Sequence, residues 1–296
     1  MESYLVKLGL NINFPFVLTM AALIWARTLS MLSVIPFLFG KPVPKITRVG
    51  ASMVITMFLY PILVTGTNLP QSVSDLNLFA LFLKEILIGL SLGFLAGMIF
   101  YGFQGAGQMI DNQRGVSLAR ILIPELGEQV SLSGSFLFHF AIVLFLLLGG
   151  HRIFLKAFVE SYNALPLLEF PQKIAGLVPL IDFFARMTGK IFFISVQIAA
   201  PVIIAILMAD IILGVANRFA PQINVWELGF NIRGYLGILI LFLSMGLIAS
   251  QVEYYTAEFQ GEMAQSVELL KGAPPPVELK PAEPPLEEPH RVVPLK

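Results

Sequence analysis

Long apolar stretches alternate with short polar segments along this chain of 296 residues. Most of the stretches are close to the length of about 20 residues that crosses a bilayer as a helix. We expect helices over residues 16–39, 49–65, 79–103, 132–148, 191–215 and 235–252. The pattern therefore predicts an all-α membrane protein.

The composition supports this fold class. The chain is 56% hydrophobic and 13% charged, with a mean hydropathy of +0.81, which is too apolar for an ordinary soluble domain. Lys plus Arg and Asp plus Glu number 19 each, so no charge excess points to nucleic acid or to an anionic partner. The absence of cysteine excludes disulfides and thiolate-based sites. The apolar run at residues 14–39 is longer than the core of a cleavable signal peptide, so we do not expect one.

The distribution of cations gives a partial topology. Residues 40–48, GKPVPKITR, carry three cations and predict a cytoplasmic loop, whereas residues 66–77 contain no Lys or Arg. Both flanks of the apolar run at 132–148 then carry cations. Either that helix does not cross, or residues 153–187 contain another crossing or a re-entrant hairpin, or the bilayer is not the only surrounding of these helices.

A polar, glycine-rich segment interrupts the apolar pattern at residues 101–125, YGFQGAGQMIDNQRGVSLARILIPE. Its glycines favour a compact loop between two hydrophobic helices. Polar side chains and irregular backbone at membrane depth require burial in protein or contact with a water-filled cavity. The segment is therefore a candidate constriction, and an ordinary polar loop at the membrane surface is the open alternative.

Two patterns within the apolar runs indicate helix packing. Gly89, Gly93 and Gly97 recur at intervals of four, which places them on one helix face and allows a neighbouring backbone to approach closely. Lys84 and Glu85 precede these glycines. We expect the two charges to face protein or to extend toward an interface, since insertion of a charge near a helix centre costs about 2.5–3.5 kcal/mol.

Residues 191–222 combine a proline and a carboxylate inside an apolar run. Pro201 predicts a kink or exposed carbonyls. Asp210 has no neighbouring cation in the sequence, so it is a functional-site hypothesis by default, while a helix-to-helix hydrogen bond or ion pair is the structural alternative.

The C-terminal region divides into two parts. Apolar residues at spacings of three and four over 251–272 predict an amphipathic helix that leaves the membrane, and its stripe consists of Val252, Tyr255, Phe259, Met263, Val267 and Leu270. Beyond it, eight of the last 25 residues are proline, which favours a disordered or partly polyproline II tail.

No arrangement of residues indicates catalysis. His139, His151 and His290 share neither a helix face nor a metal-ligand spacing. The sequence contains no phosphate-binding loop and no GxSxG elbow, and the glycine-rich segment does not follow a strand. We expect neither an enzyme nor a bound cofactor or metal.

Several motifs resemble the FliR/SctT family, a subunit of the type III export gate in flagella and injectisomes. They are Arg27 and Pro36 with the Gly40/Pro44 turn, KEILIGLSLGF, GAGQMIDNQRGVSLA, LGGHR with SYNALP, and AAPVIIAILMADIILGVANRFAPQINVW. The resemblance spans about residues 14–250, and the pattern ADxxLGxxNRxAPQ is its most specific part.

The resemblance implies long, tilted helical hairpins that close a helical ring with FliP/SctR-type and FliQ/SctS-type subunits. It places the protein in the bacterial inner membrane, extending toward the periplasm within the basal body. It implies further contacts with FlhB/SctU-type and FlhA/SctV-type export proteins, the inner rod and unfolded exported proteins. The expected organisation is a lead-in at 1–13, an export-gate domain at 14–252, an amphipathic helix at 253–271 and a tail at 272–296.

The resemblance also implies a plug at about residues 104–125. Its expected residues are Gly105, Gly107, Met109, Ile110, Asp111, Gln113, Arg114, Gly115, Val116 and Leu118. We expect the Asp111/Arg114 neighbourhood to anchor the closed plug and the apolar side chains to form the seal, while flexible glycines let it move for an exported chain.

A second set of residues is expected to pack against neighbouring subunits. It comprises Glu85, Gly89, Gly93, Gly97, Pro201, Asp210, Gly214, Asn217, Arg218, Pro221 and Gln222. A secondary transporter or channel that uses Asp210 in a Pro-kinked helix is the alternative function. An intramembrane enzyme is a third and weaker one, because no nucleophile, base or metal set converges.

Overall fold

The computed structural model describes residues 14–40, 43–64, 75–116, 131–170, 177–222 and 224–270. Within these ranges every regular element is a helix, which confirms the expected fold class. The helices are α2 (Phe14–Val34), α3 (Pro36–Phe39), α4 (Lys45–Val64), α5 (Asp75–Gln113), α7 (Leu132–Leu147), α8 (Gly150–Ala164), α9 (Leu177–Phe219), α10 (Val225–Leu243) and α11 (Met245–Leu270). The segments expected as a lead-in at 1–13 and a tail at 272–296 lie outside the described residues.

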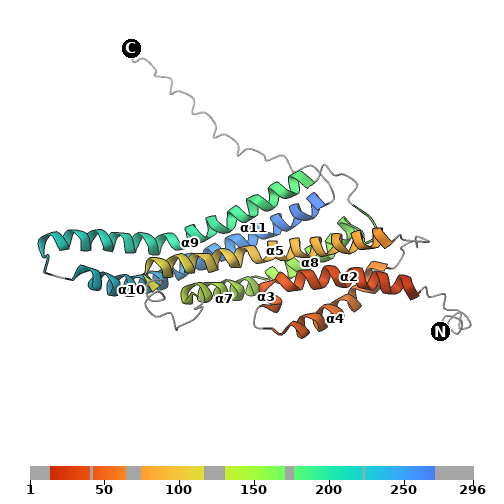
Figure 1. Ribbon diagram of the computed structural model, residues 1–296, viewed down its shortest axis with the longest axis horizontal. Coiled ribbons are helices and arrows are strands. Elements are labelled where there is room, and N and C mark those ends of the chain that lie inside the picture. The colour runs from red at the N-terminus through yellow and green to blue at the C-terminus, as the bar shows by residue number, and fades with distance from the viewer. Residues whose placement is uncertain are drawn as a thin grey trace, which may run out of the picture.

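Helix α5 is the centre of the molecule and packs against α2, α7 and α9 (Figure 1). Of its apolar window 67% is buried within the chain, against 17% for α4 and 17% for α10. Close approach to α2 depends on glycine. A Cβ on Gly89 would lie 2.3 Å from the Arg27 carbonyl oxygen, and one on Gly93 would lie 2.9 Å from that of Met31.

Phenylalanines join the central helix to the C-terminal one. The Phe145 ring lies 5.0 Å from Phe37, 5.2 Å from Phe100 and 5.7 Å from Phe259, measured between centroids. These rings come from α3, α5, α7 and α11, and tilted or edge-on pairs of this kind stabilise a core beyond their buried area. The aromatic cluster therefore fixes α11 onto the body of the protein.

Helices α9 and α10 form a long, apolar and largely exposed hairpin (Figure 1). Only 28% of the apolar window of α9 is buried, and Pro201 lies inside that helix. The turn ends where Asn224 caps α10 and accepts a hydrogen bond from the backbone of Glu227. The outward side chains of this hairpin therefore remain available to lipid or to other proteins.

In the described part of the chain, five helices are long and apolar enough to cross a membrane, or six if α7 and α8 count as one bent span. These two helices meet at Gly149, which has a φ of +79°, and are bent by 75°. A sharply broken pair accounts for cations on both flanks of α7, because neither helix continues straight across. The pair is a broken span or a re-entrant loop, and the alternatives left open by the sequence stay open.

The C-terminal expectations need two corrections. The apolar run at 235–252 is not one helix, since Ser244 separates α10 from α11. The amphipathic helix therefore begins at Met245. Val252, Tyr255, Phe259, Met263 and Val267 of its apolar stripe are buried against the rest of the chain, so the stripe serves the core of the protein.

Candidate functional site on the central helix

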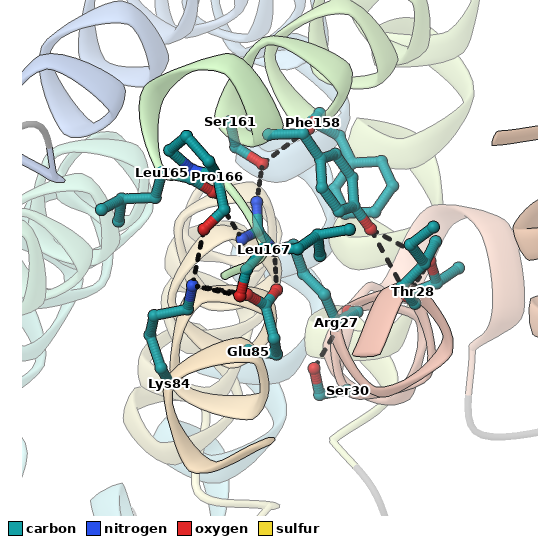
Figure 2. Close-up of polar contacts among 12 residues, drawn as sticks. Arg27, Thr28, Ser30, Lys84, Glu85, Phe158, Ser161, Leu165, Pro166 and Leu167 are labelled. Carbon is teal, nitrogen blue, oxygen red and sulfur yellow. Dashed lines mark hydrogen bonds and ion pairs between the residues drawn. The ribbon is translucent and has the colours of Figure 1, made fainter. Parts of the chain in front are cut away.

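Arg27 on α2 and Glu85 on α5 form an ion pair with no exposure to solvent (Figure 2). The Arg27 Nε donates to Glu85 Oε2. Its Nη1 donates to Ser161 Oγ at 3.1 Å, and its Nη2 donates to the carbonyl of Leu165 at 3.0 Å. A buried guanidinium is costly unless its donors are bonded, and here each guanidinium nitrogen has an acceptor.

Lys84 lies on the other side of Glu85 and extends the network to a turn after α8. Its Nζ lies 2.9 Å from Glu85 Oε1 and donates to the carbonyls of Pro166 and Leu167 at 2.8 and 3.1 Å (Figure 2). It also donates to the carbonyl of Glu169 at 2.9 Å. These carbonyls follow the end of α8 and are outside any helix, so the ammonium supplies hydrogen bonds that a helix backbone does not. The charges at 84–85 face protein, as expected.

Aromatic contact completes this network. The Arg27 guanidinium lies 4.1 Å from the centroid of the Tyr162 ring, whose hydroxyl donates to the carbonyl of Ile24 at 3.4 Å. A cation over an aromatic face is favourable in a desolvated site. The cluster of Arg27, Lys84, Glu85, Ser161 and Tyr162, which we call the Arg27 network, therefore fastens α2, α5 and α8 together and has a structural role.

A second polar cluster lies at the opposite end of α5. Asp111 is 2% exposed. Its Oδ2 accepts from Ser131 Oγ at 2.6 Å and from the Ser133 backbone N–H at 3.1 Å, and its Oδ1 accepts from Ser133 Oγ at 2.6 Å and from Arg114 Nη1 at 3.1 Å. Four bonds fill the acceptor positions of a carboxylate. We call Asp111, Arg114, Ser131 and Ser133 the Asp111 clamp.

The start of α7 explains why a carboxylate is stable here. Ser131 is the N-cap of α7 and accepts a hydrogen bond from Gly134 N–H at 2.9 Å. The free N–H groups of a helix N-terminus favour a negative charge, and Asp111 provides it from α5. The clamp consequently brings together the chain positions on either side of residues 117–130.

Helix α10 also contacts this junction of α5 and α7. Gly115 has a φ of +86° and ends α5, and a Cβ there would lie 3.2 Å from the Phe230 ring. The aliphatic part of Arg114 lies against Gly237, where a Cβ would come within 2.6 Å of it. The end of α5 therefore contacts both α7 and the apolar hairpin.

The expectation of a loop from residue 101 onward is wrong, because α5 remains helical to Gln113. The glycines serve close packing instead of irregular backbone. A Cβ on Gly102 would meet Ile194, one on Gly105 would meet Ser195 of α9, and one on Gly107 would lie 2.3 Å from the backbone of Ser133. The helix continues through these glycines because neighbouring helices pack closely against them.

The expected plug residues differ in their exposure. Ile110 is fully buried in the core, and its expected role in a seal stays a prediction. Met109, Gln113 and Val116 are partly exposed, and their plug role stays a prediction. Leu118 lies outside the described residues.

The expected subunit contacts divide as well. Four of them are buried inside the chain, and their expected role in subunit packing stays a prediction: Glu85, Gly89, Gly93 and Gly97. Residues of the distal hairpin are exposed and keep that prediction: Gly214, Asn217, Arg218, Pro221 and Gln222. Pro201 is partly buried in α9 and keeps it too.

Asp210 has a partner on the next helix. Arg233 Nε of α10 donates to Asp210 Oδ1 at 2.6 Å, so the pair joins the two arms of the hairpin. This agrees with the structural alternative, an ion pair between helices. Arg233 was missed as a site residue, although it is the sole cation in the sequence of α10.

The serines of the clamp were missed too. Ser131 and Ser133 precede and begin an apolar run, which is the position of a helix N-cap. That signal predicts a helix start but does not predict a carboxylate from another helix.

Comparison with known proteins places these features in a family. The model of bacterial export proteins, family 1, matches residues 18–259. The chain belongs to this family. The resemblance to FliR/SctT proteins is thereby confirmed, and the matched range includes both the Arg27 network and the Asp111 clamp.

The relatives include proteins named for flagellar biosynthesis and for the presentation or translocation of other proteins. The chain is 33% identical over 183 residues to surface presentation of antigens protein SpaR of Shigella flexneri, covering 62% of this chain and 69% of the relative. It is 29% identical over 247 residues to flagellar biosynthetic protein FliR of Escherichia coli (strain K12), covering 82% and 91%. It is 33% identical over 195 residues to Yop proteins translocation protein T of Yersinia pestis, covering 66% and 73%.

The names of these relatives refer to surface presentation of antigens, flagellar biosynthesis and translocation of Yop proteins, and the family that they share with this chain is one of bacterial export proteins. The apolar helices and the family together indicate an inner-membrane protein.

Proposed function

We propose that this protein is a structural and gating subunit of the type III protein export gate. The observation that carries the proposal is the Asp111 clamp, which fastens the end of α5 to the start of α7. In this proposal the clamp holds a plug at the channel constriction in its closed position. Release of the clamp separates the two helix ends and lets the segment between them leave the channel.

The buried geometry gives the clamp the properties of a latch. Hydrogen bonds to a charged acceptor contribute about 1.5–3 kcal/mol each, and Asp111 is nearly inaccessible to water. In the closed position, these hydrogen bonds stabilise the junction of α5 and α7 against thermal opening. Val116 and the residues that follow it in sequence then take the sealing role, because Ile110 belongs to the core.

The exposed hairpin supports the structural half of the proposal. Helices α9 and α10 present large apolar side chains, among them Ile212, Phe219 and Trp226 at 65%, 82% and 73% exposure. Exposed apolar surface of this extent requires lipid or protein against it. We assign it to FliP/SctR-type and FliQ/SctS-type subunits in a helical ring that extends toward the periplasm.

Further partners follow from the same assignment. FlhB/SctU-type and FlhA/SctV-type export proteins and the inner rod adjoin the ring, and unfolded exported proteins pass through it. Nucleic acid is not among the proposed partners.

Conductance of the assembled gate tests the proposal. Asp111→Asn and Ser133→Ala each remove bonds of the clamp while leaving side chains of similar size. We expect cells that carry either variant in an assembled apparatus to become permeable to small ions. Asp182→Asn is the control, because Asp182 is exposed and pairs with Arg186 one turn away.

Unchanged conductance, with co-purification showing that the variant complex has assembled, would contradict the gating role. Failure of the wild-type protein to co-purify with other export-gate subunits would contradict the structural role.

A further inference from the structure

An apolar groove runs between α2 and α4, away from the polar clusters of α5. Its volume is about 570 Å³. It exists because Ala21 and Ala22 on α2 are small, while Leu18, Trp25, Met57 and Tyr60 form higher walls around them. Helix α4 packs chiefly on α2, so its other faces are open.

The groove offers almost nothing to a polar ligand. The Trp25 indole N–H donates to Ser52 Oγ at 2.8 Å, and the Thr56 hydroxyl donates to the carbonyl of Ser52 at 2.7 Å. These polar groups are thus already bonded within the chain. A bound molecule would contact hydrocarbon along most of its length.

Positive charge lies at one end of the groove. Lys45 begins α4, is exposed, and shares a helix face with the groove residue Thr56, eleven positions later. That separation is about 16 Å along the helix axis, close to half of the roughly 30 Å hydrocarbon thickness of a bilayer. Lys45 therefore stands at headgroup level when the groove lies within one leaflet.

Arg48 adds a second cation one turn further along. Its Nη2 donates to the carbonyl of Gly40 at 2.8 Å, and its buried Nε has no hydrogen-bond acceptor within the described part of the chain. The N-terminus of a 20-residue helix adds favourable potential for a negative charge.

The sequence indicates which leaflet is concerned. Residues 40–48 contain three cations, which predicts that this connection lies on the cytoplasmic side. The cytoplasmic leaflet carries anionic lipids that attract basic residues next to membrane helices. We propose that the α2/α4 groove holds one acyl chain of an anionic phospholipid, whose phosphate binds Lys45 and Arg48. The proposal is independent of the gating role.

Native mass spectrometry of the full chain tests it, with phosphatidylglycerol and phosphatidylcholine added separately to delipidated protein in detergent. We expect one retained phosphatidylglycerol, with a preference over phosphatidylcholine of about fivefold for each cation. Lys45→Gln together with Arg48→Gln should remove the preference and keep residual binding of both lipids. Lys156→Gln, at an exposed site on α8, is the charge control.

The groove itself is tested by filling it. Ala22→Phe should abolish retention of both lipids, whereas Ala216→Phe at an exposed position of α9 should not. Equal retention in Ala22→Phe and wild type would overturn the proposal, as would the absence of a phosphatidylglycerol preference in wild type.

Photo-crosslinking gives a readout that does not depend on a folded Ala22→Phe variant. Phosphatidylglycerol with a diazirine in its acyl chain should label peptides of α2 and α4 in the wild-type protein. Labelling confined to other helices would overturn the proposal. The chain has no native cysteine, so a cysteine introduced by Met57→Cys reports on the groove alone. Its cross-linking to a partner protein in the assembled apparatus would also overturn the proposal.

Discussion

Arg27 on α2 donates a hydrogen bond to Glu85 on α5, and neither side chain is exposed to water. They are 58 positions apart in the sequence, and all of α4 lies between them. Lys84 shares the same carboxylate from its other side. One anion therefore compensates two buried cations, and its removal should affect the fold more than the removal of either cation.

We expect Glu85→Gln to lower the free energy of unfolding by about 3–5 kcal/mol, because it leaves buried cations without an anion. Thermal unfolding of the purified full chain in detergent measures this, together with the steady-state amount of protein in cells. Asp182→Asn removes an exposed ion pair and should change stability by less than about 1 kcal/mol. A Glu85→Gln variant as stable as wild type would show that the network is not required for the fold.

Gly107 and Gly214 provide a matched pair of glycine substitutions. We expect Gly107→Ala to destabilise the protein by about 1–3 kcal/mol, since its Cβ would meet the backbone of α7. Gly214 has nothing within 4 Å of the corresponding position, so Gly214→Ala should stabilise α9 by up to about 1 kcal/mol. Unfolding temperatures of the two variants that shift in the same direction would contradict this packing.

The ion pair of Asp210 and Arg233 is tested by exchanging the two charges and measuring the protease resistance of the hairpin. Either Asp210→Arg or Arg233→Asp alone should loosen the α9/α10 hairpin and increase its cleavage by protease in detergent. The double exchange should restore resistance, because the opposite charges again face each other. If the double variant is cleaved faster than both single variants, the pair does not hold the hairpin.

Glu262 on α11 predicts a pH dependence of stability. Burial raises the pKa of its carboxyl above the ordinary value of 4.5, and the opposing effect of Lys190 is smaller. The folded state thus holds this proton more tightly than the unfolded state. The contribution of Glu262 to stability is largest below pH 4.5 and is lost as the pH rises through the raised pKa.

Glu262→Gln should remove this contribution and flatten the unfolding temperature across the weakly acidic range. Glu253→Gln, at an exposed position of the same helix, should leave the wild-type profile unchanged. Identical profiles for Glu262→Gln and wild type would contradict the assignment.

The helices themselves could be predicted from the sequence because apolar runs of membrane length leave few alternatives. The spacing of Gly89 and Gly93 correctly predicted a close helix contact. Its partner could not be predicted, because the same spacing fits a helix of this chain and a helix of another subunit equally well. The structure places that contact on α2.

The end of α5 shows where local reasoning failed. Several glycines and polar residues indicated a loop, yet Gly102, Gly105 and Gly107 continue a helix whose neighbours leave no room for a Cβ. Propensity favours a loop there, and tertiary packing overrides it. The prediction that Asp111 and Arg114 form an anchor depended on their charges and not on the backbone, and the structure joins both to α7.

A covalent lock on the Asp111 clamp tests the central claim most directly. The chain contains no cysteine, so Asp111→Cys with Ser133→Cys introduces the sole pair that can form a disulfide within it. Oxidation should join α5 to α7 and stop export through the assembled apparatus, and reduction should restore export to the level of the reduced double variant. Export that continues at the reduced rate when the disulfide has formed completely would contradict gating at this junction.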